Sequence, residues 1–376
     1  MRKSLFFLFM VLLPINLISQ TSDEVSGPPA QGAAHRLTAL PGFQVSVFAA
    51  GLNNPRGLAL SPEGVLYACD MKDGFVLALT DSAAKGYCSQ PQTIIRGLDH
   101  PHSLIFHDGK LYVGETTRIS CFSSWGSSLD ASDGRTIISL PPGGRHFTRT
   151  LDFGPDGKLY LSIGSTCDAC EEKDPRYGTI CRLNADGTGF EIFAQGLRNA
   201  VGIRFRPGTS QLWASGNGRD YLGDDLPPEG FYLVEGGKNY GWPYSYSLNG
   251  KTVSDPEWGR KGIRQTGQPI FEYQAHTAPL GINFYTGQVY PARFKDGLFV
   301  CFHGSWNRSI PVGYKVVFFP LEKNSLAGKP VDFLWGFLQD PERVGRPVDV
   351  VNGAKGELYV SDDYGGRIFR IVYDGT

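Results

Sequence analysis

The feature that most constrains the fold is a segment that occurs six times along the chain. Each copy has a polar start, an apolar strand, a turn and a second apolar strand. The first reads GLNNPRGLALSPEGVLYACDMKDGFVLAL, the second turns at HDGK and the third at GPDG. The copies occupy residues 51–79, 97–122, 146–165 closed by 178–183, 196–234, 276–321 and 345–371.

Short strands that are grouped at a spacing of about forty to fifty residues, with a turn every eight to twelve, are typical of propeller blades. A single copy would leave an apolar face in water, so the copies must pack against one another. The sequence therefore predicts an all-β, six-bladed β-propeller over residues 39–376. An open β-sandwich or two small barrels are the alternatives, but neither explains why the same polar start recurs. The 48 Gly and 25 Pro fit many turns.

The first twenty residues, MRKSLFFLFMVLLPINLISQ, have a basic start, an apolar run and small or polar residues at the end. This pattern predicts a secretory signal over residues 1–20, followed by a flexible lead-in over residues 21–38. No cysteine follows closely, which excludes a lipoprotein. No later stretch approaches the roughly 20 apolar residues of a membrane-spanning helix. We therefore expect an exported protein, periplasmic or secreted, without a transmembrane anchor.

Charge and cysteine content narrow the function further. Lys and Arg total 36 and Asp and Glu total 37, so no bulk charge attracts nucleic acid or an anionic membrane. Cys167 and Cys170 lie in a polar loop of an exported chain, which favours a local disulfide. A redox or metal role is the alternative, but no second CxxC completes a zinc site. Four cysteines in strand-like runs are expected to be buried apolar residues: Cys69, Cys121, Cys181 and Cys301.

Cationic and amide side chains gather just before the expected innermost strands, at Asn54, Arg56, His100, His102, His146, Arg198, Asn199 and Arg346. In a propeller these pre-strand segments meet at one end of the central channel. No acidic residue is among them, and arginine matches carboxylates in a bidentate way, so we expect an anion-binding pocket. For any single arginine, a surface position is the alternative.

His146 is the candidate for acid–base chemistry. A histidine with an ordinary pKa of about 6.5 can remove a proton near neutral pH. The alternative is a structural histidine that only makes hydrogen bonds.

The fourth copy carries an unusual loop, ASGNGRDYLGDDLPPEG. Its glycines would let carbonyl oxygens approach a hard cation, and Asp220, Asp224 and Asp225 supply charge, as calcium requires. The spacing does not fit an EF-hand. A solvated acidic turn is the alternative.

Six motifs in this order, HFTRTLDFGPDGKLYLSIGS, GLRNAVGIRF, NGRDYLGDDLPPE, EGGKNYGWP, HGSWNRS and GRPVDVV, resemble the glucose/sorbosone dehydrogenase family of soluble quinoproteins. The likeness is strongest to its L-sorbosone dehydrogenase-like branch and runs from about Gly42 to Tyr373. It implies a six-bladed propeller that holds pyrroloquinoline quinone (PQQ), a tricarboxylate, together with Ca²⁺. It also implies oxidation of a sugar or a related alcohol or aldehyde.

The resemblance assigns roles to matching residues. His146 resembles the general base that takes the proton of a sugar hydroxyl while hydride passes to the quinone. Arg198 and Asn199 resemble contacts to cofactor and substrate beside the reacting carbonyl, and so share the catalytic role. Arg308 and Arg346 would clamp carboxylates of the quinone.

The same resemblance implies metal ligands. The backbone carbonyls of Gly218 and Arg219 would bind the cofactor's calcium, with Asp220 supplying charge beside them. Glu229 and the carbonyl of Tyr240 resemble a second, structural calcium site.

The chain also departs from the glucose-oxidising members. Arg145 precedes His146 where an acidic residue is common, and Val348 stands where a second clamp arginine is found, which argues against glucose as substrate. No C-x-x-C-H haem motif is present, so electrons should leave to a separate acceptor, a quinone or a cytochrome. Two other functions stay open: a calcium-dependent, lactonase-type hydrolase and a propeller that binds without catalysis.

Overall fold

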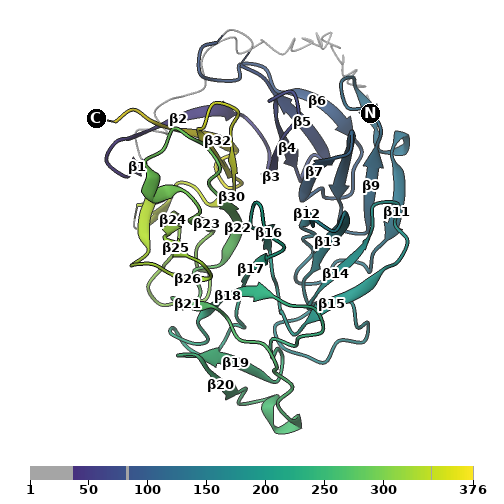
Figure 1. The fold of residues 1–376 in the computed structure, drawn as a ribbon, viewed down its shortest axis with the longest axis vertical. Coiled ribbons are helices and arrows are strands. Elements are labelled where there is room, and N and C mark those ends of the chain that lie inside the picture. Colours follow the sequence, from purple (N-terminus) through teal and green to yellow (C-terminus); the bar gives the residue numbers. More distant parts are fainter. Residues whose placement is uncertain (1–36, 82–83, 340, 376) are drawn as a thin grey trace, which may run out of the picture.

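The computed structural model describes residues 37–81, 84–339 and 341–375, and within them six sheets of four or five strands form a ring. The six innermost strands surround the centre of the ring in Figure 1, each in contact with the next, and β30 closes the circle on β3. The predicted all-β, six-bladed propeller is confirmed. The predicted signal, residues 1–20, and the lead-in up to residue 36 lie outside the described residues.

Each blade runs from an innermost strand at the channel to an outermost strand at the surface. From the innermost strand outward, blade 1 comprises β3 (Pro55–Leu60), β4 (Leu66–Asp70), β5 (Phe75–Leu79) and β6 (Gln92–Arg96). Blade 2 comprises β7 (Ser103–His107), β8 (Lys110–Gly114), β9 (Arg118–Phe122) and β11 (Arg135–Ser139). Blade 3 comprises β12 (Leu151–Phe153), β13 (Lys158–Ile163), β14 (Thr179–Asn184) and β15 (Glu191–Gln195). Blade 4 comprises β16 (Gly202–Phe205), β17 (Leu212–Gly216), β18 (Glu229–Val234) and β21 (Phe271–Tyr273). Blade 5 comprises β22 (Pro279–Phe284), β23 (Leu298–Phe302), β24 (Lys315–Phe319) and β27 (Val331–Trp335). Blade 6 comprises β30 (Pro347–Asn352), β31 (Leu358–Asp362), β32 (Arg367–Tyr373) and β2 (Phe43–Ala50).

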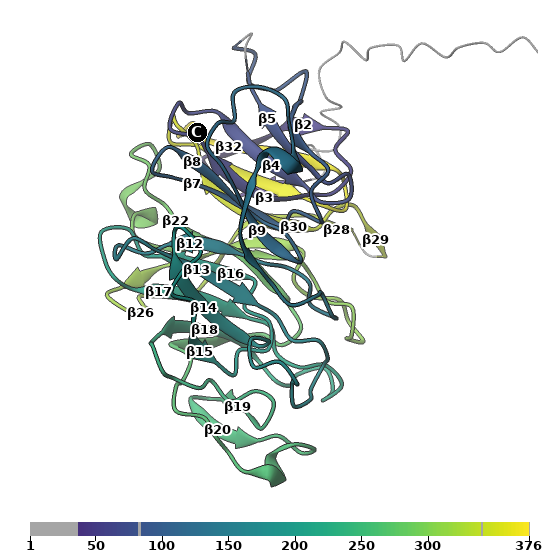
Figure 2. The same ribbon diagram turned by 90° about the vertical axis from the view of Figure 1, so that its right-hand side faces the viewer.

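Short elements decorate the ring. They are β1 (Thr38–Ala39) beside β27, β10 (Leu129–Asp130) beside β6, the hairpins β19 (Ser245–Leu248)–β20 (Lys251–Ser254), β25 (Leu321–Glu322)–β26 (Ser325–Leu326) and β28 (Leu338–Gln339)–β29 (Glu342–Arg343), and the 3₁₀ turns η2 (Ala131–Asp133), η3 (Gly259–Lys261) and η4 (Ala292–Phe294). The β19–β20 hairpin projects from the end of the molecule in Figure 2. None of the helices in the described part of the chain is long and apolar enough to cross a membrane.

The two ends of the fold share blade 6. Strand β2 pairs antiparallel with β32, so the first long strand of the chain becomes the outermost strand of the last blade. This pairing places Phe43 against the blade 5 rings of Phe333 and Phe294, with centroids 4.9 and 5.2 Å away. A fully buried phenylalanine contributes roughly 1.5–3 kcal/mol. The ring is therefore closed by ladder hydrogen bonds and by an aromatic core together.

The end of the second strand separates the blades into two groups. In blades 1, 2 and 6 the last residue of this strand, or the one directly after it, is a buried acid: Asp70, Glu115 and Asp362. Each carboxylate accepts a backbone N–H of its own pre-strand segment, from Asn54 (2.7 Å), Asp99 (2.7 Å) and Arg346 (2.8 Å) respectively. The corresponding residues of blades 3, 4 and 5 are Ile163, Gly216 and Phe302.

The loops that follow the second strand differ in the same way. Blades 1, 2 and 6 pass to their third strand through residues 71–74, 115–117 and 363–366. Blades 3, 4 and 5 use residues 164–178, 217–228 and 303–314. The three long loops stand at the end of the channel where the pre-strand segments meet.

Candidate functional site

A cavity of about 280 Å³ lies at this end of the channel. Blades 3, 4 and 5 supply most of its wall, and blades 1 and 6 supply one arginine each. The polar residues that matter for its chemistry are Arg56, His146, Arg198, Asn199, His303 and Arg346.

Most of the predicted site residues share this cavity. His146, Arg198, Asn199, Gly218, Asp220, Glu229 and Arg346 line it. Arg219 and Tyr240 instead line a neighbouring cavity of about 50 Å³, together with Trp242 and Asp255. Arg308 lies at the rim, where its guanidinium bonds the carbonyl of Asp224 and pairs with Asp225 at 3.1 Å. Its guanidinium therefore points to the acidic loop, and the cavity lining does not include it.

The two histidines before β7 do not join the site. His100 is exposed, and its Nδ1 lies 2.9 Å from the Asp99 carboxylate. His102 is buried, with Nε2 3.4 Å from the Arg56 guanidinium, and burial lowers its pKa. Among the described residues, blade 2 therefore contributes nothing to the cavity wall.

The ring of His146 has a defined tautomer. Its Nδ1 lies 2.9 Å from both the carbonyl and the hydroxyl oxygen of Ser165. A carbonyl oxygen can only accept, so Nδ1 carries the proton and Nε2 carries the lone pair. Burial and the charges of Arg198 and Arg145 lower the pKa of His146 to about 3. The ring is therefore neutral near pH 7, and its Nε2 has no partner among the described residues.

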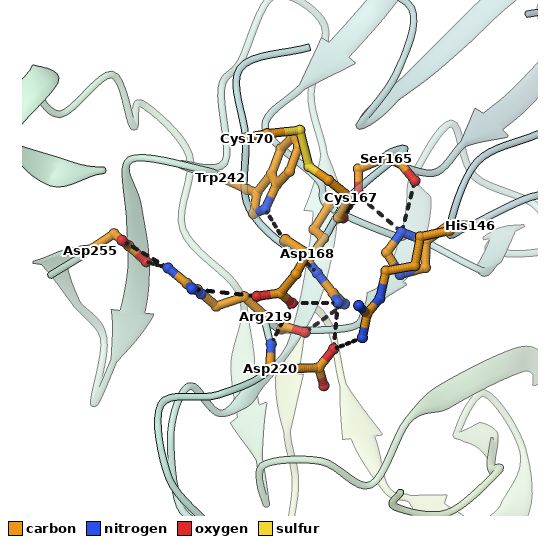
Figure 3. A network of polar contacts seen from close by, with 12 residues as sticks. His146, Ser165, Cys167, Asp168, Cys170, Arg219, Asp220, Trp242 and Asp255 are labelled. Carbon is orange, nitrogen blue, oxygen red and sulfur yellow. Dashed lines mark hydrogen bonds and ion pairs between the residues drawn. A yellow bond between two sulfur atoms is a disulfide. The ribbon is translucent and has the colours of Figure 1, made fainter. Parts of the chain in front are cut away.

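Arg198 is the centre of a polar network, and its partners Asp168 and Asp220 are labelled in Figure 3. Its Nε donates to the carbonyl of Asp168 (2.9 Å), Nη1 to the carbonyl of Gly218 (2.7 Å), and Nη2 to the carboxylates of Asp168 and Asp220 (2.8 Å each). Arg145 shares Asp220 at 2.8 Å. Burial raises the pKa of Asp220, and the Arg198 charge opposes this.

The cationic pre-strand residues have acidic partners that were not predicted from the sequence. The pre-strand segments are cationic as predicted, but the loops after the second strands bring carboxylates to them. Arg56 pairs with Asp363, and Asp168 and Asp220 hold Arg198. Spacing along one segment does not reveal these partners, because each comes from a different loop.

The arginines differ in the donors left for a ligand. A guanidinium has five N–H groups. Arg346 uses two of them, from Nε to the carbonyl of His303 (2.9 Å) and from Nη2 to that of Gly304 (2.7 Å). Arg198 uses four. Within the described residues, Arg346 is thus left with three N–H groups and Arg198 with one, and burial disfavours the charged form of Arg346 until an anion joins it.

The predicted metal ligands already have hydrogen-bond partners, and they do not all lie at one cavity. The carbonyl of Gly218 faces the network, and it already accepts from Arg198. Glu229 is fully buried and accepts the N–H of Gly218 (2.8 Å) and of Ala278 (3.1 Å), and burial raises its pKa to about 7. The Tyr240 hydroxyl donates to the carbonyl of Leu233, in the neighbouring cavity.

The cysteine predictions agree with the structure. Cys167 and Cys170 form a disulfide, and the other five cysteines are buried. Among the described residues, the one group of three metal-ligating side chains within reach of each other is this pair with Glu172, whose sulfurs the disulfide occupies.

The rim of the cavity was not predicted as a site. Trp306 and Tyr221 are 59 % and 60 % exposed and meet edge to face at 5.8 Å. The guanidinium of Arg145 lies over both rings, 5.2 and 6.0 Å from their centroids. The tryptophan in HGSWNRS and the arginine before His146 were visible in the sequence, but their contact depends on loops from three blades.

A sequence model described as glucose/sorbosone dehydrogenase matches residues 112–370. The chain belongs to this family. An uncharacterised protein of Borreliella burgdorferi is 30% identical over 99% of this chain and 98% of that protein. A pyrroloquinoline quinone-dependent pyranose dehydrogenase of Coprinopsis cinerea is 26% identical over 93% of this chain, which spans only 56% of the length of that enzyme.

The fold of this family member is also found in solved structures. The holo form of the pyranose dehydrogenase PQQ domain from Coprinopsis cinerea has a TM-score of 0.75, with 22% identity over 89% of this chain and 97% of that one. At this identity the likeness supports the propeller fold alone.

Proposed function

We propose that this chain is an exported dehydrogenase that uses PQQ and calcium to oxidise a sugar or a related alcohol or aldehyde. The observation that carries the proposal is His146, a neutral ring on the cavity wall whose Nε2 lone pair is left without a protein partner in the described structure. Arg198, Asn199 and Arg346 share that wall. The named activity of the Coprinopsis cinerea relative supports the same reaction class.

The donor set fits a tricarboxylate. Arg346 would hold a carboxylate with its three remaining N–H groups, and Arg198 would add one from blade 4. The backbone carbonyl of Gly218 and the carboxylate of Asp220 offer the hard oxygens that calcium takes. When bound, PQQ supplies the hydride acceptor and calcium acts on it as a Lewis acid.

His146 would act as the general base. Its Nε2 accepts the proton of the substrate hydroxyl, and the Nδ1–H bond to the Ser165 carbonyl stabilises the charged ring that results. Burial is the main cause of the low pKa of this ring and the charges of Arg198 and Arg145 add to it, so carboxylates that neutralise the arginines would raise the pKa part of the way. Asn199 lies beside His146, close enough to orient the same hydroxyl.

Separate features support the substrate class and the location that we propose. Arg145 and Trp306 narrow the rim, which favours a substrate other than glucose, and a sorbosone-type aldehyde is one candidate. The signal predicted over residues 1–20 and the half-buried disulfide support export to the periplasm or the medium. Electrons would pass to a separate quinone or cytochrome.

The lactonase-type hydrolase is the second candidate. Asn199, Asn217, Asp220 and Glu229 line the cavity and could hold a catalytic calcium. Asp220 is paired with two arginines under either proposal, so it does not decide between them. The match to the glucose/sorbosone dehydrogenase family and the Nε2 of His146, unpartnered within the described part of the chain, favour the dehydrogenase.

The test is reconstitution. Apo-protein receives PQQ with calcium or with chelator, and reduction of a redox dye is followed across a panel of aldoses, uronates and sugar aldehydes. Calcium-dependent turnover of any member supports the proposal. Absence of turnover, with hydrolysis of a lactone panel, would replace it by the hydrolase, and absence of both would leave a binding propeller.

A further inference from the structure

The loop that joins β13 to β14, residues 164–178, carries the disulfide and has no regular secondary structure. Cys167 and Cys170 are half-buried at the cavity end of blade 3, and they enclose Asp168 (Figure 3). Nothing in the reaction proposed above uses this disulfide. Its neighbours nevertheless contact both residues that the reaction depends on.

One set of contacts leads to His146. The hydroxyl of Ser165 donates to the carbonyl of Cys167 (2.7 Å), which fixes the orientation of the Ser165 side chain. The carbonyl and hydroxyl oxygens of Ser165 then accept from Nδ1 of His146. The carbonyl of Cys167 thus orients the Ser165 hydroxyl, one of the two acceptors of the histidine proton.

A second set of contacts leads to Arg198. The carbonyl of Asp168 accepts from Nε of Arg198 (2.9 Å) and from the indole N–H of Trp242 (3.0 Å). Its carboxylate accepts from Nη2 of Arg198 (2.8 Å) and from the backbone N–H of Asp220 (2.7 Å). Backbone and side chain of one residue therefore hold the same guanidinium, which is possible only in one loop conformation.

We propose that the Cys167–Cys170 disulfide is a clamp that positions His146 and Arg198 for the reaction, with Ser165 and Asp168 as the positioning residues. The inference rests on the proposed function of these two side chains. A disulfide with a sequence separation of three closes a very small loop. Loop-closure entropy grows with loop length, so this bond adds little to the stability of the whole propeller and acts on the local conformation.

Reduction is the direct perturbation, because the bond is half-buried and the other five cysteines are buried. One thiolate of a dithiol such as dithiothreitol attacks a protein sulfur and breaks the S–S bond. The second thiol then closes the reagent's own disulfide and releases two protein thiols. Two electrons and two protons pass from the reagent to the protein.

The experiment follows the histidine ring and turnover together. Protein labelled with ¹⁵N-histidine is studied by NMR before and after dithiothreitol, with His146 assigned from His146→Asn. We expect the Nδ1–H signal of His146 to shift and broaden on reduction. In the PQQ-loaded protein, kcat should fall about 10- to 100-fold with a smaller change in KM, because small misplacements of catalytic groups cost rates of this order.

Two variants serve as controls. Cys167→Ser with Cys170→Ser should show the reduced behaviour from the start and should not respond to dithiothreitol. Asp168→Asn keeps the disulfide and the Ser165 contacts but removes the carboxylate charge that holds Arg198, so it should lower kcat while the Nδ1–H signal of His146 stays sharp. The two variants therefore distinguish the contacts that hold His146 from those that hold Arg198.

An unchanged His146 signal after complete reduction, verified by alkylation of two thiols, would overturn the proposal. So would unfolding of the reduced protein, because the bond would then stabilise the whole fold. If the loaded protein oxidises no sugar, the proposed function fails, while the histidine signal still decides whether the clamp exists.

Discussion

Blades 1, 2 and 6 differ from blades 3, 4 and 5 in how they hold the segment before the innermost strand. In the first group a buried acid at the end of the second strand accepts a backbone N–H of that segment, as Glu115 does from Asp99. The second group lacks an acid at this position. There the N–H of His146 donates to the Ser165 carbonyl, and the N–H of Ala278, directly before β22, donates to Glu229 of the neighbouring blade.

The difference separates scaffold from site. Where a buried acid accepts an N–H of the segment before the innermost strand, the loop after the second strand is a short turn. Where Ile163, Gly216 or Phe302 takes the place of the acid, the loop is long and the side chains before the strand face a cavity. Three blades thus have short turns at this end of the channel, and three carry the long loops beside the cavity. Arg56 and Arg346 nevertheless reach the cavity from blades 1 and 6.

The largest expected effect is on turnover. His146→Ala should lower kcat by about 10²- to 10⁴-fold, because general-base catalysis contributes on this scale. PQQ binding should remain, since the arginines are intact. The matched control is His100→Ala, which removes the exposed histidine of blade 2 and should leave dye reduction unchanged. Equal losses of kcat in both variants would contradict the assignment of the active site to blades 3, 4 and 5.

The next effect is on stability and concerns the closing blades. Glu115 is fully buried and accepts from Arg118 (2.7 and 3.0 Å), from the Ser120 hydroxyl and from Asp99. Glu115→Gln should lower the free energy of unfolding by about 2–3 kcal/mol, as loss of a buried charged acceptor does. Chemical denaturation measures this, and kcat should stay at the wild-type value.

The exposed pair of Glu191 and Arg182 supplies the control for that prediction. Glu191→Gln should leave the free energy of unfolding nearly unchanged, because surface ion pairs contribute little. A loss of activity without a loss of stability in Glu115→Gln would contradict the scaffold role of blade 2.

A smaller effect is expected at Gly164, the first residue of the long loop of blade 3. A Cβ there would lie 2.6 Å from both the Asn199 amide oxygen and Cβ of His146, so Gly164→Ala must push them apart. We expect kcat to fall about 10- to 100-fold with stability nearly unchanged. Gly126→Ala, where the Cβ meets nothing within 4 Å, is the control. Steady-state kinetics and thermal unfolding of both variants decide.

The last prediction concerns the dependence of stability on pH. The folded pKa of His146 is about 3, against about 6.5 in an unfolded chain, so the unfolded state binds more protons between these values. The free energy of unfolding should therefore fall as pH drops from about 6.5 toward 3. His146→Asn should remove about 3 kcal/mol of the fall in the free energy of unfolding between pH 7 and pH 4. A parallel slope in the variant would contradict a neutral, buried ring.

Much of the fold could be predicted because the repeat is local. Strand, turn and strand recur with Leu66-Tyr67, Leu111-Tyr112 and Leu159-Tyr160 at the same place, and each blade needs its neighbours. The role of β2 could not be predicted, because its partner β32 lies at the other end of the chain and no local pattern specifies it.

The site was predictable in part for the same reason. His146, Arg198 and Arg346 stand just before innermost strands, so their position in the repeat places them at the channel end. Arg308 lies in a long loop, as do Asp168 and Asp220, the two acids that hold Arg198, and the course of these loops depends on side-chain hydrogen bonds between blades. Sequence spacing carries no information about these bonds, so the pairing of the acids with Arg198 was missed.

We propose above all that the cavity of blades 3, 4 and 5 binds PQQ with calcium through arginines held by the scaffold. Isothermal calorimetry tests this by titration of apo-protein with PQQ, with calcium and with chelator, in wild type, Arg346→Ala and Glu115→Gln. We expect one calcium-dependent site in wild type, the same site in Glu115→Gln and a large loss of affinity in Arg346→Ala. Equal binding in wild type and Arg346→Ala, or no binding in any of the three, would contradict the proposal.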